Sequence, residues 1–173
     1  MVETIRQLLD YPGMIAFVNG HDWVWPLCEM IHYIGMSLII GIIGMLDLRI
    51  LGYGKGIPPA AINKLVPVAI IAFVANLVTG LVFITGNPAG GPEAYLSNLS
   101  FQLKMGSVLL AGLNLAYFYI SGLERKVVAM PGRGDAPASA KAVALLSIIF
   151  WLSVIFFGRM LMYNDTLLLL FNM

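Results

Sequence analysis

Glu29 and His32 stand three residues apart inside an apolar run, from Trp25 to Leu51, that is long enough to cross a bilayer. Ionisable side chains at membrane depth are costly, so they usually face a bundle interior or a wet cavity and mark a functional site. The pair is therefore the first candidate for a cofactor, metal or proton site in this chain.

Cys28, His32 and Met36 recur every four residues, which places a thiol, an imidazole and a thioether along one helix face. Soft ligands of this kind suit Cu(I), so these three residues are the candidate metal ligands. The Glu-x-x-His spacing is also found in carboxylate-bridged di-iron proteins, but such a site needs two of these motifs and two further glutamates. The chain has one motif, which argues against a di-iron centre.

A b-type haem is the preferred cofactor, with copper as the less favoured choice. His32 is the only imidazole inside the expected spans, so haem would be five-coordinate or completed by a neighbouring group. Lys104 and Arg159 could bind the haem propionates. His21 lies too near the expected surface to be the second ligand within one subunit, although a protomer interface or a folded-back N-terminal tail could bring it in.

The composition predicts an integral membrane protein of the all-α class. Of 173 residues, 60% are hydrophobic and 11% are charged, which is far from a soluble domain, and the net charge of +1 gives no sign of nucleic-acid binding. A hydrocarbon core of about 30 Å needs roughly 20 apolar residues. Four stretches satisfy this, and we expect a single domain with a four-helix transmembrane bundle at residues 25–50, 65–85, 101–121 and 142–162.

The N-terminal tail lacks the basic segment and cleavage site of a secretory signal, so we expect it to stay on the mature protein. Ile5, Leu8 and Leu9, followed by Pro12 and Gly13, predict a short amphipathic helix at the membrane interface.

The basic residues predict the orientation. Under the positive-inside rule, Lys and Arg in short loops mark the cytoplasmic side. They gather in the first and third expected loops, as Lys55, Lys64, Arg125, Lys126, Arg133 and Lys141. We therefore expect a bacterial inner-membrane protein with both termini and the second loop on the periplasmic side.

With this orientation, three helices place ionisable groups in one outer layer, composed of Glu29, His32, Lys104 and Arg159. Such a layer would be nearly charge-compensated, which lets charges persist at that depth. In the alternative, Lys104 and Arg159 extend to the headgroups and only Glu29 and His32 face inward.

Small residues predict the packing seams, with Ala72, Asn76 and Gly80 on the second expected helix and Ser107 and Ala111 on the third. Asn76 and Asn114 are expected to hydrogen bond between helices. Asp47 is expected to pair with a basic group of the first or third loop. The Gly and Ala stripes also fit association into a homo-oligomer within the lipid bilayer.

Several motifs between residues 23 and 121 carry a resemblance to a known family. They are Glu29-x-x-His32-x-x-Gly35, Gly41, Asp47-Leu48-Arg49-Ile50-Leu51-Gly52, Phe101-x-x-Lys104 and Leu110-Ala111-Gly112-Leu113-Asn114. The chain resembles an uncharacterised family of small bacterial four-helix membrane proteins, similar in pattern to the copper-resistance protein D membrane domain. The resemblance implies a fold and a membrane location but no reaction. In that pattern a His often follows the Asn114 segment, where this chain has Tyr119.

Three functions remain open from the sequence. The first is a redox or cofactor module centred on His32, the second a non-catalytic subunit that scaffolds a homo-oligomer or complex, and the third a small transporter or proton path. No nucleophile with its base and no phosphate-binding glycine loop is apparent, so an enzymatic activity of the chain alone is not expected.

Overall fold

The computed structural model describes residues 4, 7, 9–88 and 90–163. Four helices are long and apolar enough to cross a membrane, at Val24–Leu51, Pro59–Thr85, Leu99–Ile120 and Ala138–Tyr163. The described residues contain no strand. The all-α class and the four membrane-spanning helices are therefore confirmed. Ile5 and Leu8 of the expected interfacial helix lie outside the described residues.

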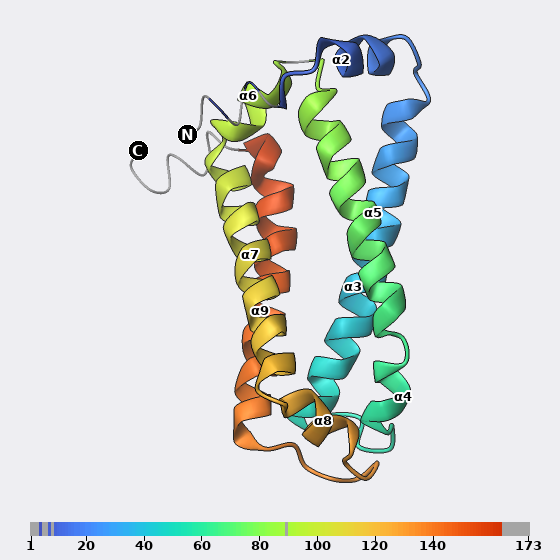
Figure 1. The fold of residues 1–173 in the computed structure, drawn as a ribbon, viewed down its shortest axis with the longest axis vertical. Helices are drawn as coiled ribbons and strands as arrows, with labels where there is room; N and C mark the ends of the chain where they lie inside the picture. The colour runs from blue at the N-terminus through green and yellow to red at the C-terminus, as the bar shows by residue number, and fades with distance from the viewer. Residues whose placement is uncertain (1–3, 5–6, 8, 89, 164–173) are drawn as a thin grey trace.

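The bundle consists of two helix pairs (Figure 1). Helix α3 (Val24–Leu51) packs against α5 (Val66–Thr85), and α7 (Leu99–Ile120) packs against α9 (Ala138–Met160), with η1 (Leu161–Tyr163) following α9. Helix α3 also contacts α9, which joins the two pairs. The pairs meet at the lower end of the bundle in Figure 1.

Short helices occupy segments that the sequence assigned to loops or to the N-terminal tail. Helices α4 (Pro59–Asn63) and α8 (Leu123–Val128) lie at the end where the pairs meet, whereas α2 (Pro12–Asn19) and α6 (Gly91–Leu96) lie at the other end (Figure 1). Helices α2, α4 and α6 each have a proline in the first two positions, where its missing N–H would have no helical partner. The proline and glycine residues that predicted loops therefore also start helical turns.

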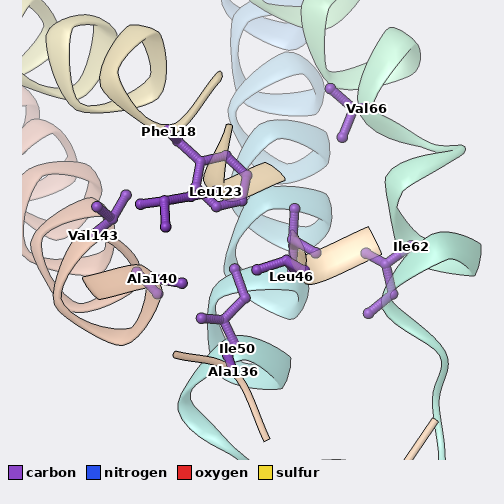
Figure 2. Close-up of a cluster of buried hydrophobic side chains, with 11 residues drawn as sticks. Leu46, Ile50, Ile62, Val66, Phe118, Leu123, Ala136, Ala140 and Val143 are labelled. Carbon is purple, nitrogen blue, oxygen red and sulfur yellow. The ribbon is translucent and has the colours of Figure 1, made fainter. Parts of the chain in front are cut away.

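The main buried cluster lies where the two pairs meet (Figure 2). It joins α3, α4, α5, α7, α8 and α9 through Leu46, Ile50, Ile62, Val66, Phe118, Leu123, Val127, Ala136, Ala140, Val143 and Ala144. Because side-chain packing drives helix association in lipid, this end holds the two pairs together.

Arg49 ties the connections of this end to the last turn of α3. Its side chain is 2% exposed, and it donates hydrogen bonds to the carbonyl oxygens of Ile57, Gly132 and Gly134 at 2.8, 2.5 and 3.2 Å. A second link joins the same segments at the surface, where Lys55 forms an ion pair with Asp135 at 2.8 Å. The hydrogen bond and charge of Lys55 lower the pKa of the Asp135 carboxyl.

Asp47 differs from its sequence expectation. It is 6% exposed and lies near Ser147 of α9, and it forms no ion pair with a described cation of the loops. Arg49 is the basic residue nearest to Asp47 in the sequence, but its guanidinium binds backbone carbonyls instead.

We predict that Arg49→Gln destabilises the bundle, because three loop carbonyls lose a charged donor and a shorter side chain cannot reach all of them. Hydrogen bonds from charged groups contribute roughly 1.5–3 kcal/mol, so the free energy of unfolding should fall by about 2–3 kcal/mol. Thermal unfolding of the detergent-purified protein measures this. Arg133→Gln is the control, since Arg133 is exposed in the same connection and makes no hydrogen bond to another described residue; an equal loss in both variants would contradict the prediction.

Candidate functional site

His32 is held against α5 by a side-chain hydrogen bond. Its Nδ1 lies 2.8 Å from Thr79 Oγ1, and that hydroxyl itself donates to the carbonyl oxygen of Ala75 at 2.9 Å. With the hydroxyl proton of Thr79 directed to the Ala75 carbonyl, Thr79 accepts a hydrogen bond from His32. In that arrangement the proton of a neutral imidazole is on Nδ1 and a lone pair remains on Nε2.

An aromatic ring lies beside this imidazole. The ring of Phe83 is 5.4 Å from the His32 ring in an edge-on arrangement, and the Trp25 ring is 5.1 Å from the Phe83 ring. A Cβ atom at Gly80 would lie 3.9 Å from His32 Cε1. Helix α5 thus forms a wall beside His32 through Thr79, Gly80 and Phe83.

Helix α5 lies close to His32 because α3 and α5 come together at Gly35 and Asn76. A Cβ atom at Gly35 would overlap the Asn76 amide and lie 3.1 Å from the carbonyl oxygen of Ala72, so only glycine fits. With its amide turned so that nitrogen faces α3, Asn76 donates to the His32 carbonyl at 3.0 Å and accepts from Met36 N at 3.2 Å. The expected role of Asn76 as an interhelical hydrogen-bonding residue agrees with this geometry. Asn114 plays the same part between α7 and α9, where its amide donates to the Val143 carbonyl at 3.0 Å.

Glu29 lies on a different part of the α3 surface. It is exposed, and its Oε1 accepts a hydrogen bond from the indole of Trp25 at 3.0 Å. Burial raises the pKa of the Tyr95 phenol on α6, and the charge of Glu29 raises it further. The Glu29 carboxylate is therefore bonded to Trp25, and its charge acts on Tyr95.

Of the two expected cations, the structure brings one towards His32. Lys104 is half-buried on α7 and lies close enough to His32 for their charges to interact. The Lys104 side chain passes close to Gly158 of α9, where an added Cβ atom would lie 3.8 Å from Lys104 Nζ. Arg159 is exposed and contacts the Tyr163 ring, with 5.8 Å from Cζ to the ring centroid.

The expected metal ligands Cys28, His32 and Met36 are all half-buried on α3. The part of the chain that the structure describes contains no group of three or more His, Cys, Asp or Glu residues that could hold a metal ion. A site at His32 would thus draw on the thiol and thioether of its own helix or on a ligand from outside the described residues.

Comparisons of the chain with protein-family models, with curated proteins and with solved structures find no match. The site is therefore interpreted from its own geometry.

Sequence reasoning missed the contribution of α5. It compared residues by charge and depth, and Thr79 and Phe83 carry no charge. A signal was present, because Thr79 adjoins the small-residue stripe of Ala72, Asn76 and Gly80, which already predicted the face of α5 that meets another helix.

We predict that Gly35→Ala separates α3 from α5, because the new methyl group overlaps the Asn76 amide. Overpacking of this kind costs about 1–3 kcal/mol, which a lower midpoint of thermal unfolding in detergent would show.

Gly41→Ala is the matched control on the same helix, since its Cβ meets nothing within 4 Å. It should leave stability unchanged or raise it slightly, because alanine favours helices. Equal shifts in the two variants would show that the Gly35 contact does not carry the packing.

Proposed function

We propose that this chain is a small membrane module that binds a redox cofactor, a b-type haem in preference to copper, through Nε2 of His32. The observation that carries the proposal is the hydrogen bond from His32 Nδ1 to Thr79. Imidazoles that ligate metals typically donate their other N–H to a fixed acceptor, which sets the tautomer and the ring orientation. The residues present fit one axial bond of this kind.

Charge supports the same assignment. Lys104 is the cation within electrostatic reach of His32, so it would pair with a carboxylate of the cofactor. Arg159 and Glu29 lie at the same end of the bundle, with Arg159 at the exposed end of α9 as a second partner for an anionic group. Haem would supply one-electron transfer, whereas the protein orients the ligand and neutralises its charge.

A second ligand to the haem iron would come from another group. His21 bonds through Nδ1 to the Phe17 carbonyl at 2.9 Å and lies on the exposed connection between α2 and α3. A second copy of the chain in a homo-oligomer could complete the coordination. Copper, in the competing assignment, would take Cys28 and Met36 together with His32.

We predict that haemin added to the detergent-purified protein gives a Soret band at one haem per chain, and that His32→Ala abolishes it. His21→Ala should keep the band. Thr79→Val retains the shape of the side chain but removes the acceptor, so haem affinity should fall about tenfold while the band persists. An unchanged band in His32→Ala would refute His32 as the ligand.

Metal analysis of the same preparation separates the other functions. Stoichiometric copper that is lost in Cys28→Ser and Met36→Leu would support the copper site. Absence of both haem and copper, with altered assembly in Glu29→Gln, would instead support a scaffolding subunit. A proton or substrate flux in vesicles without either cofactor would support a transporter.

We also propose a bacterial inner-membrane location with the α4 and α8 end in the cytoplasm. The basic residues of that end support it, since Lys55, Lys64, Arg125, Lys126 and Arg133 lie on its connections and short helices. The resemblance to small bacterial four-helix membrane proteins is consistent with this location.

We predict that alkaline phosphatase fused after Met173 is active in a bacterial host, because this enzyme folds only after export. The same reporter inserted after Arg133 should be inactive. The reverse pattern would place the basic end outside and overturn the orientation.

A further inference from the structure

A cavity of about 150 Å³ lies between the two helix pairs, at a different level of the bundle from His32. All four long helices line it, and most of the lining is apolar. Its aromatic residues are Phe73, Phe118, Tyr119 and Trp151. A cavity of about this volume with apolar walls holds a single benzene ring in other proteins.

The exposed large side chains of the lining come from α5 and α7, which belong to different pairs. Ile70 on α5 and Leu115 on α7 line it and are 55% and 42% exposed, so the opening is at the outer surface of the bundle. In a membrane-spanning chain that surface faces lipid. A ligand would therefore enter from the hydrocarbon phase and must be soluble there.

One group in the lining is polar and incompletely bonded. Asp47 is 6% exposed, and its Oδ2 has no hydrogen-bond partner among the described residues. Asp47 and Ser147 both line the cavity. An unpaired buried acceptor is unfavourable, so this oxygen calls for a donor that the described side chains do not supply.

We propose that this cavity binds the ring of a membrane-soluble quinol, with a ring hydroxyl donating a hydrogen bond to Asp47 Oδ2. The three observations select this class together. The volume and aromatic walls fit one ring, the opening into lipid requires an apolar molecule, and the carboxyl oxygen requires a hydroxyl donor. The inference is independent of a cofactor at His32.

The test uses the full chain in detergent micelles under anaerobic conditions, with empty micelles as the blank. Isothermal titration compares tetramethylhydroquinone with its dimethyl ether, which has the same ring but no donor. The quinol should bind saturably at one site per chain and about tenfold more tightly than the ether, as expected for a hydrogen bond to a carboxyl group. Equal affinities would show an apolar hole without a specific polar contact and would overturn the proposal, as would no saturable binding.

Two variants locate the site. Gly112 lines the cavity and a Cβ there meets nothing within 4 Å, so Gly112→Leu should fold and abolish binding of both compounds by filling the space. Gly106→Leu is the control on the same helix, because a Cβ at Gly106 also meets nothing within 4 Å and Gly106 is not among the lining residues; it should bind as the wild type does. Asp47→Leu should keep binding of the ether and remove the preference for the quinol. Binding unaffected by Gly112→Leu, or a preference retained in Asp47→Leu, would overturn the proposal.

Discussion

The close approach of α3 and α5 at Gly35 is the constraint on which the candidate site depends. Asn76 occupies the space that any side chain at position 35 would fill, and its amide reaches the backbone groups of His32 and Met36. The hydrophobic effect does not drive helices together in lipid, so contacts of this kind must hold the pair. Thr79 lies three residues beyond Asn76 on the same helix, which is why the approach at Gly35 also brings a hydroxyl to His32.

The two ends of the bundle differ in how they are held together. At the α4 and α8 end, the buried cluster and the Arg49 hydrogen bonds join both helix pairs. At the α2 and α6 end, the described ionisable residues are half-buried or exposed. Burying the apolar cluster at one end thus fixes the fold without requiring the charged layer to be compact. Charges can then remain near the membrane surface, where they are less costly than at its centre.

Much of the fold could be predicted because hydropathy and length dominate in a membrane chain. The four spans, the packing role of Asn76 and the interhelical bond of Asn114 all followed from residue type and spacing. The rotation of each helix about its own axis could not be predicted in this way. Depth grouped Glu29 with His32 but did not predict that the Glu29 carboxylate accepts a hydrogen bond from Trp25. Asp47 shows the same limit, because its neighbour Ser147 comes from α9 and no local pattern links them.

His32 and Asp47 lie on one helix, yet they belong to different parts of the architecture. Fifteen residues of helix separate them by about 22 Å at 1.5 Å per residue. His32 bonds within the α3 and α5 pair, whereas the Asp47 cavity lies between the pairs and is lined from all four long helices. A ligand in the cavity would therefore bridge the pairs, and a ligand on His32 would act within one of them. Because α3 carries both residues and contacts α5 and α9, it is the element through which occupancy of one site could influence the other.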